Sequence, residues 1–199
     1  MSRANLCKVK ISRGSLLGRS VSFTEHENLR PTPSRVREAV FSMLADYAEE
    51  EYGFIDACAG SGVMGFTAVS CEFAPVIMVE NNRDALAELE TNKRRLDVSA
   101  EIILGSAVQV RKLPMSAGPW ICYADPPFTD RKFHGKLMKR LAEHAPFAIG
   151  SLYVAEHEVP LEPLPGFVLL KDKKYGRTLI SVFEKDSQVE AIVAESEAE

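Results

Sequence analysis

The sequence contains no long hydrophobic run and only four cysteines. No apolar stretch among its 199 residues approaches the roughly 20 residues that a membrane-spanning helix needs. The first residues, MSRANLCKVKISRG, lack the apolar segment of a secretory signal peptide. The cysteines form no CxxC pair and have no histidine at ligand spacing, which argues against a zinc site and favours reduced or core thiols. We therefore expect a cytoplasmic protein without a membrane segment or a metal ion.

The charges are distributed unevenly, although the net charge is only −4. Residues 1–40 carry eight Lys and Arg against three acids, whereas the last fourteen residues contain five acids and no base. Two further basic clusters, at 131–140 and 171–177, contain five and four cations. Phosphate contacts depend on such local patches more than on net charge, so a nucleic-acid partner remains compatible with the composition. An ordinary solvated face is the alternative interpretation of each cluster.

Short apolar runs alternate with helical patterns along most of the chain. Strands are predicted at 52–58, 75–80, 100–104, 120–124, 149–156, 167–171 and 178–184. Helices are predicted at 62–72, 82–97 and 131–145, and another with Thr32 as its cap and Pro33 at its first position. This alternation indicates an α/β fold with a mostly parallel sheet covered on both faces. The tight link at 174–177 predicts that the last two strands form an antiparallel hairpin.

Three segments are expected from these patterns. Residues 1–29 alternate weakly around Gly14 and Gly18, which predicts a short, basic β extension. Residues 30–185 form the main domain. The acidic segment 186–199 has the composition of a frayed or disordered tail.

The stretch FIDACAGSGVMGF contains a glycine-rich loop, Gly60–Gly65, between a predicted strand and a predicted helix. Such glycines allow a tight turn and a close approach of the backbone to a ligand, although a simple turn is the alternative. Asp56 precedes the loop, where its charge would repel a pyrophosphate but suit a cationic amino-acid group. Glu80 ends the next strand, where a carboxylate accepts hydrogen bonds from ribose hydroxyls. A role for Glu80 at the start of the next helix is the alternative. A nucleoside cofactor is favoured.

The tetrapeptide Asp125–Phe128, Asp-Pro-Pro-Phe, follows the fourth predicted strand of the main domain at the carboxyl edge of the sheet. Each proline fixes its own φ and extends the residue before it, which predicts a rigid ledge. The ledge would present the Asp125 carboxylate and a backbone carbonyl to one planar NH₂ group, while Phe128 stacks on the attached ring. The pattern therefore favours chemistry on the exocyclic amine of a base. An Asp-Pro turn that begins a helix is the alternative.

These motifs resemble those of the RsmD family, bacterial S-adenosylmethionine-dependent methyltransferases of guanine N2 in 16S ribosomal RNA. The resemblance runs in order from residue 9 to residue 185. It is carried by LRPTPSRVREAVFSML (29–44), DACAGSGVMGFTAVS (56–70), VEN (79–81), ADPPF (124–128) and KYGRTLISVFEK (174–185). It implies the class I methyltransferase fold, a seven-stranded, mostly parallel Rossmann-like sheet with an antiparallel last strand.

The resemblance also implies roles for individual residues and partners. Catalytic roles fall on Asp125, Pro126, Pro127 and Phe128. Contacts with the cofactor S-adenosyl-L-methionine fall on Thr32, Asp56, Ala57, Gly60, Gly62, Glu80, Asn81, Ser106, Ala107 and Asp125. The implied partner is 16S rRNA or an assembling small ribosomal subunit. A monomer is expected, although the sequence does not decide the oligomeric state.

Two departures from the family pattern concern contacts rather than chemistry. Gly105–Ala107 stands where the family usually has Asp or Asn near the adenine, which leaves a hydroxyl or backbone for that contact. Near the N-terminus, the stretch Arg13–Arg19 has one cation fewer than the family pattern R-G-x-x-[KR]-G-R, and Asn28 stands where the family usually has a glycine before Leu29.

The implied mechanism is an in-line methyl transfer without a covalent enzyme intermediate. The N-terminal extension, Arg35, Arg37 and the 131–140 cluster would contact phosphates of structured RNA. For Arg35 and Arg37, solvation or pairing with Glu38 is the alternative.

Other functions also remain open at this point. The tetrapeptide equally fits an adenine-N6 methyltransferase of DNA or RNA. The glycine loop alone fits a nicotinamide-dependent oxidoreductase, but that alternative predicts a further substrate domain, for which these 199 residues are too few. A non-catalytic RNA-binding module is the third alternative.

Overall fold

The computed structural model describes residues 5–24, 32–49, 51–109, 113–127, 130, 132–144, 146–162 and 164–186. The chain divides into two compact units, Met1–Lys112 and Leu113–Glu199, and each is described by itself. Within the described ranges, no helix has both the length and the apolar character needed to cross a membrane. The predicted acidic tail, apart from Asp186, lies outside the described residues.

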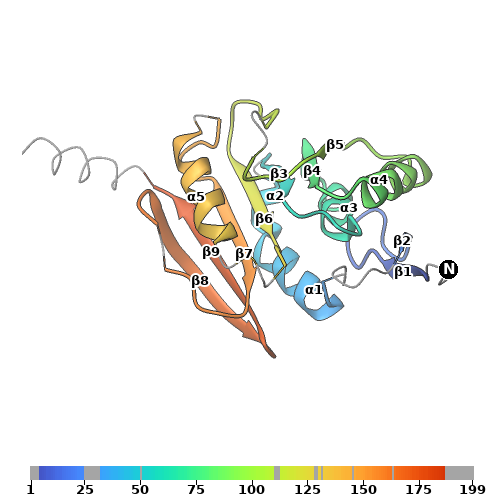
Figure 1. The fold of residues 1–199 in the computed structure, drawn as a ribbon, viewed down its shortest axis with the longest axis horizontal. Helices are drawn as coiled ribbons and strands as arrows, with labels where there is room; N and C mark the ends of the chain where they lie inside the picture. The colour runs from blue at the N-terminus through green and yellow to red at the C-terminus, as the bar shows by residue number, and fades with distance from the viewer. Residues whose placement is uncertain are drawn as a thin grey trace, which may run out of the picture. The chain divides into compact units, whose positions relative to one another are not determined.

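The first unit contains a parallel sheet with the strand order β5-β4-β3 and a separate two-stranded antiparallel hairpin, β1-β2 (Figure 1). Its strands and helices, in chain order, are β1 (Leu6–Lys10), β2 (Ser20–Thr24), α1 (Ser34–Met43), α2 (Ala45–Glu49), β3 (Gly53–Asp56), α3 (Val63–Ser70), β4 (Val76–Glu80), α4 (Arg83–Leu96) and β5 (Glu101–Leu104). Every residue of β3 and β4 is buried, as expected of parallel strands covered on both faces. The predicted β extension is therefore a hairpin.

Helix α1 begins two residues later than the predicted cap. Pro33 is the N-cap residue, and no side chain caps the helix, so the predicted capping role of Thr32 is wrong. Instead, the Thr32 carbonyl accepts a hydrogen bond from Arg37 Nη1 at 2.5 Å. Proline at the N-cap leaves no side-chain oxygen for the first helical N–H groups, so the arginine provides the local link.

Helix α3 is buried around almost its whole circumference, and the loop of the N-terminal hairpin contacts its last residue. Ser70 makes the connection: its carbonyl accepts the N–H of Ser15 at 2.8 Å, and its hydroxyl donates to the Arg13 carbonyl at 2.5 Å. Gly14 has a φ of +78°, and a Cβ there would lie 1.8 Å from the Ser70 oxygen. Only glycine fits this contact.

Strand β2 packs against helix α4 and is held to it by polar side chains. The Asn92 amide accepts from the Ser22 N–H at 3.0 Å and donates to the Ser22 carbonyl at 2.6 Å. Arg19 donates to the carbonyls of Arg95 and Leu96, at 2.7 and 3.0 Å, where α4 ends. A cation at a helix C-terminus satisfies free carbonyls and stabilises the helix dipole. Arg19 therefore has a structural role, in addition to any contact of the extension with RNA.

The second unit contains four strands in the order β6-β7-β9-β8. Its elements are β6 (Trp120–Ala124), α5 (Phe133–Glu143), β7 (Leu152–His157), β8 (Phe167–Tyr175) and β9 (Thr178–Lys185). Strands β6 and β7 are parallel, whereas β9 is antiparallel to both β7 and β8. The predicted hairpin is confirmed, although β8 extends four residues beyond its predicted end. The strands of the two units confirm the predicted fold class, mostly parallel with an antiparallel last strand.

We expect Asn92→Ala to lower the free energy of unfolding by roughly 1–3 kcal/mol, because the amide is buried and both of its bonds to Ser22 would be lost. Urea denaturation measures the change. The control is Thr91→Ala, an exposed neighbour whose hydroxyl bonds within its own helix, and which should change stability by less than about 0.5 kcal/mol. Equal effects of the two substitutions would show that Asn92 does not hold the hairpin.

Candidate active site

Glu80 joins the glycine loop to the carboxyl edge of the first unit's sheet. Its carboxylate accepts the Gly60 N–H through Oε2 at 2.7 Å and the Asn82 N–H through Oε1 at 2.8 Å. The loop after β3 and the turn after β4 therefore share one acidic side chain. The structure brings Gly60 and Glu80, two predicted cofactor residues, into direct contact.

Asp56 ends β3 at the same edge and is almost fully buried, with 1% of its surface exposed. Its Oδ2 accepts the Gly65 N–H at 3.0 Å, whereas Oδ1 is buried without a hydrogen-bond partner among the described residues. Burial raises the pKa of Asp56 to about 7 with a contribution from the nearby Glu80 carboxylate, although the N–H groups of Gly65 and Cys58 oppose this shift. A ligand that brings a cationic N–H group to Oδ1 would stabilise the ionised form.

The glycines of the loop have different roles. Gly60 and Gly62 have φ values of +50° and +78°, in the left-handed region that L side chains rarely adopt. Gly62 is also the N-cap of α3, and a Cβ there would lie 2.3 Å from Leu89 Cδ2. At Gly65, a Cβ would lie 2.6 Å from the Met78 side chain, so this glycine permits close packing of α3 on β4. The loop thus presents backbone rather than side chains at the sheet edge.

The remaining predicted cofactor residues of the first unit lie in four places. Ala57 is buried in the loop after β3, and Asn81 is exposed directly after Glu80. Ser106 is half-buried and Ala107 buried after β5, whose end is linked to β4 by the Gly105 N–H and the Glu80 carbonyl at 2.8 Å. Thr32 is buried ahead of α1.

Sequence reasoning missed the role of Asn82. Its side chain accepts the N–H groups of Asp84 and Ala85, at 2.8 and 3.1 Å, and so caps α4. The pattern of an Asn before a helical segment could have revealed it.

The Asp-Pro-Pro segment leaves β6 in the second unit as predicted. Asp125 is half-buried, Pro126 is buried and Pro127 is exposed. The Pro127 carbonyl accepts the Asp130 N–H at 2.8 Å in the turn before α5. This turn therefore engages the second proline carbonyl of the ledge. Phe128 lies outside the described residues, so its stacking role stays a prediction.

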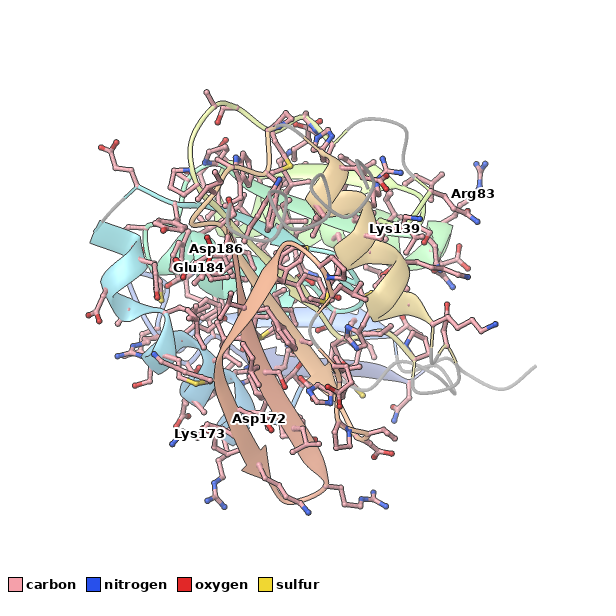
Figure 2. The ribbon with its side chains drawn as sticks, turned by 90° about the vertical axis from the view of Figure 1, so that its left-hand side faces the viewer. Arg83, Lys139, Asp172, Lys173, Glu184 and Asp186 are labelled. Atoms are coloured by element: carbon pink, nitrogen blue, oxygen red, sulfur yellow. The ribbon has the colours of Figure 1, made fainter. Side chains whose placement is uncertain are left out.

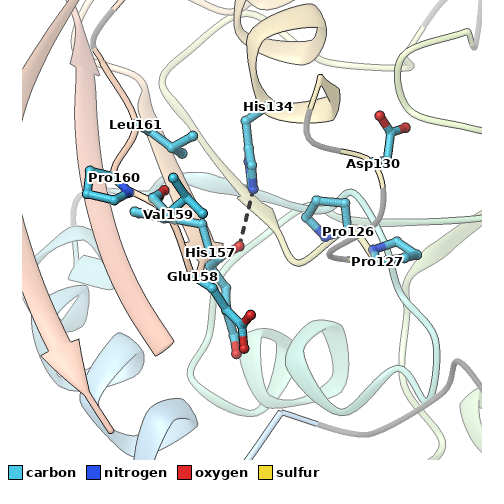
Figure 3. Close-up of a pocket in the computed structure, with 10 residues that line it drawn as sticks. Pro126, Pro127, Asp130, His134, His157, Glu158, Val159, Pro160 and Leu161 are labelled. Atoms are coloured by element: carbon cyan, nitrogen blue, oxygen red, sulfur yellow. Dashed lines mark hydrogen bonds between the residues drawn. The ribbon is translucent and has the colours of Figure 1, made fainter. Parts of the chain in front are cut away.

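A pocket of about 210 Å³ lies beside this ledge (Figure 3). Pro126 and Pro127 line it together with Asp130, His134 and the consecutive residues 156–161. Its walls are mostly apolar, and its lining residues include the acidic Asp130, Glu156 and Glu158. Sequence reasoning did not identify this pocket, because its second wall is the loop after β7, which carries no recognised motif.

Buried polar groups support the pocket wall. His134 lies with Nδ1 2.8 Å from the Tyr153 hydroxyl and Nε2 3.2 Å from the Glu156 carbonyl. Burial, together with nearby His157, lowers the pKa of His134 to about 4, so the ring is neutral near pH 7. A neutral ring satisfies both contacts when Nε2–H donates to the carbonyl and Nδ1 accepts from the hydroxyl. The Glu156 carboxylate accepts from the Tyr123 hydroxyl at 2.5 Å, and burial raises its pKa.

The cations predicted to contact RNA separate into exposed and buried groups. On α5, Lys132, Lys136 and Lys139 are exposed at helical spacing and form one basic stripe; Figure 2 labels Lys139 on this helix. Arg35 is also exposed. Arg37, in contrast, is 4% exposed and donates to the carbonyls of Thr32 and Lys10. The predicted phosphate contact of Arg37 is therefore wrong, because its guanidinium is used inside the first unit.

The cysteines and acidic residues of the described ranges form no metal centre. Cys7, Cys58, Cys71 and Cys122 are not joined in disulfides. No group of three or more His, Cys, Asp or Glu side chains in these ranges could hold a metal ion.

The strand order and the solved relatives define the class I methyltransferase fold. The structure of yhhF from Escherichia coli is 27% identical, with a TM-score of 0.78 that covers 92% of this chain and 100% of that chain. An RNA methyltransferase from Salinibacter ruber, solved with S-adenosyl-L-homocysteine, shares the fold at 16% identity and a TM-score of 0.58, over 80% of this chain and 96% of that one.

Within that class, the family described as "Conserved hypothetical protein 95" matches residues 9–184, and the chain belongs to this family. The Ribosomal RNA small subunit methyltransferase D of Haemophilus influenzae is 32% identical over 181 residues, 85% of this chain and 90% of that protein. The protein of the same name from Escherichia coli is 28% identical over 189 residues, 92% and 93% of the two chains. The predicted resemblance to the RsmD family is confirmed.

Stability without cofactor should fall as the pH rises toward and through 7, because the folded state holds a proton on Asp56 that the unfolded state releases near pH 3.8. Relative to Asp56→Asn, the wild type should lose roughly 2–3 kcal/mol between pH 5 and pH 8. Urea denaturation at both pH values measures this difference, with the exposed Asp46→Asn as control. Parallel pH curves for wild type and Asp56→Asn would contradict the assignment.

We expect Gly62→Ala to destabilise the protein more than Gly18→Ala. Both glycines have φ near +80°, so both substitutions cost roughly 1–2 kcal/mol of backbone strain. Only at Gly62 would the new Cβ also collide with Leu89 and Phe66, whereas nothing lies within 4 Å at Gly18. Thermal or urea unfolding of the two variants separates strain from crowding. An equal loss would mean that the loop has room for a side chain.

Proposed function

We propose that this protein transfers a methyl group from S-adenosyl-L-methionine to the exocyclic N2 of a guanine in 16S ribosomal RNA, during assembly of the small subunit in the cytoplasm. The observation that carries the proposal is the Asp125-Pro126-Pro127 ledge at the end of β6, beside a small and mostly apolar pocket. Membership of the family and the names of its rRNA methyltransferase relatives support the substrate class. Residues 30–185 form the methyl-transfer domain in this proposal.

The edge formed by β3 and β4 suits the cofactor. S-adenosylmethionine supplies an activated methyl group on a sulfonium when bound. Asp56 Oδ1, which has no hydrogen-bond partner in the part of the chain that the structure describes, would accept a hydrogen bond from its cationic amino-acid end. Gly60 and Gly62 would let the backbone approach that end. Glu80 keeps lone pairs for the ribose hydroxyls beside its two backbone bonds. Further contacts are assigned to Thr32, Ala57, Asn81, Ser106 and Ala107, the last two near the adenine.

The ledge would hold the target amine. The Asp125 carboxylate and the Pro126 carbonyl accept hydrogen bonds from the two N–H groups of this amine, since the Pro127 carbonyl is already bonded to the Asp130 N–H. This arrangement favours pyramidal nitrogen and directs its lone pair at the methyl carbon. The N–C bond forms while the S–C bond breaks, its electron pair stays on sulfur, and Asp125 takes up the N2 proton. Positioning contributes much of the rate, and the base must be unpaired or flipped to reach the pocket.

The basic stripe on α5 and Arg35 would contact RNA phosphates. Lys132, Lys136 and Lys139 are exposed, as phosphate contacts require. Binding should accordingly weaken steeply as the salt concentration rises.

Methyl transfer can be tested with purified protein, tritiated S-adenosylmethionine and three substrates: DNA, naked 16S rRNA and small subunits at stages of assembly. We expect label in rRNA or subunits, recovered as N2-methylguanosine after nuclease digestion. Label on adenine or only in DNA would replace the proposal with the adenine-N6 alternative. The absence of transfer to any substrate, with the cofactor bound, would favour an RNA-binding module.

We expect Asp125→Ala to reduce kcat by at least about 10²-fold, because the amine loses an acceptor of its developing charge. The cofactor dissociation constant, measured by calorimetry, should rise by a much smaller factor than kcat falls, because Asp125 is only one of ten residues assigned to cofactor contacts. Asp125→Asn keeps a carbonyl acceptor at the same position and should retain more activity than the alanine variant. Full activity of Asp125→Ala would refute the catalytic assignment.

A further inference from the structure

We propose that Glu158 determines the base specificity of the pocket, by accepting a hydrogen bond from the N1–H of the target guanine. The inference rests on the proposed methyl transfer to guanine N2 and names the residue that would distinguish this base from others. Glu158 directly follows β7 and lines the same pocket as the proline ledge.

The strand register places the two walls of the pocket opposite each other. Strands β6 and β7 are parallel, and Ala124 pairs with Ala155. The segments 125–127 and 156–158 therefore leave the same edge of the sheet from neighbouring strands. In Figure 3, Pro126 and Pro127 lie on one side of the pocket, and Val159, Pro160 and Leu161 lie on the other. A base whose amine rests on the ledge extends toward the second segment.

The pocket has the size and walls for one base. Its volume of about 210 Å³ lies below the roughly 300–1,000 Å³ of pockets that bury drug-sized ligands. Both ring nitrogens of His134 are engaged, with Tyr153 and with the Glu156 carbonyl, so the ring contributes mainly its carbon surface. The residues given for the pocket lining include acids but neither Lys nor Arg within the described ranges. Such a lining would repel a phosphate, whereas it attracts the N–H groups of a base.

Glu158 offers a side-chain acceptor on the wall that faces the ledge. The Glu156 carboxylate is buried and bonded to the Tyr123 hydroxyl. Asp130 belongs to the ledge side, where its backbone joins Pro127 to the start of α5. Glu158 is exposed, and among the described residues no hydrogen bond or ion pair engages its carboxylate.

The loop that carries Glu158 is held in place by a single imidazole. His157 Nδ1 lies 2.7 Å from the Val159 carbonyl, so the bond spans Glu158. The other ring nitrogen lies 2.7 Å from the Ser181 hydroxyl, which donates to Asp172 at 2.8 Å. Figure 2 labels Asp172 on the β8–β9 hairpin. A fixed loop lets one exposed carboxylate select a base, because little ordering is needed when the base binds.

The chemistry of the base edge explains the selection. Beside its exocyclic amine, guanine carries N1 with a hydrogen, whereas N1 of adenine carries a lone pair. An ionised carboxylate is an acceptor only, so it bonds to the guanine N1–H and repels an unprotonated N1. Glu158 would thus combine an attractive contact with the right base and a repulsive one with the wrong base.

The test uses 2-aminopurine, which keeps the 2-amine of guanine but has no hydrogen on N1. Two 16S rRNA substrates are prepared by ligation, and they differ only at the nucleotide that the wild type methylates, which is guanine in one and 2-aminopurine in the other. Each is supplied as naked RNA or as assembled subunit, whichever form the wild type accepts. For the wild type, kcat/KM should be roughly 10- to 100-fold higher with guanine. In Glu158→Gln, whose amide can also donate to an unprotonated N1, this ratio should fall about tenfold or more.

The matched control is Glu162→Gln, an exposed acid of the same loop that does not line the pocket, and it should keep the wild-type ratio. A comparison of ratios cancels the loss of O6, which both enzymes experience. An unchanged ratio in Glu158→Gln, an equal fall in the control, or equal losses on both substrates would overturn the inference. A wild type that methylates no rRNA would instead refute the proposed function itself.

Discussion

The Glu80 carboxylate holds the ligand edge of the first unit, because its two oxygens accept N–H groups from two different loops. Hydrogen bonds to an ionised acceptor are stronger than neutral ones, and the bond at Gly60 is short at 2.7 Å. The glycine loop is thereby fixed against the end of β4. The same negative charge acts on buried Asp56 and contributes to its raised pKa. Two carboxylates close together at a sheet edge favour a ligand that brings hydroxyl and cationic N–H groups.

Buried polar groups have a comparable role in the second unit. Burying a polar side chain is unfavourable unless it is hydrogen-bonded, and His134, Glu156 and His157 each have partners. Such satisfied networks make a wall rigid, because any displacement leaves a group unpaired. In the proposed function, this rigidity keeps the loop after β7 at a constant position opposite the proline ledge.

The elements of the fold could largely be predicted, since apolar runs and helical periodicity are local properties. The strand predicted at 120–124 matches β6, and the hairpin of β8 and β9 follows from its short link. The positions of Asp56, Glu80 and Asp125 at the ends of strands were predictable, because they follow from local motifs. The burial of Arg37 and the capping of α4 by Arg19 were not, because each depends on a carbonyl distant in sequence. An arginine pattern alone does not distinguish a phosphate contact from a contact with backbone oxygen.

The sequence by itself determined the fold class, the glycine loop and the acid that precedes the prolines, because spacing and backbone restriction are written in neighbouring residues. The tertiary structure decided which groups remain available to a ligand. It engaged the Pro127 carbonyl in a turn, left Asp56 Oδ1 without a hydrogen-bond partner within the described ranges, and placed residues 156–161 beside the ledge. Availability depends on every neighbour in space, and parallel strands bring together residues that lie about thirty positions apart. The pocket and the role proposed for Glu158 therefore follow from the register of β6 and β7, which no single segment of the sequence reveals.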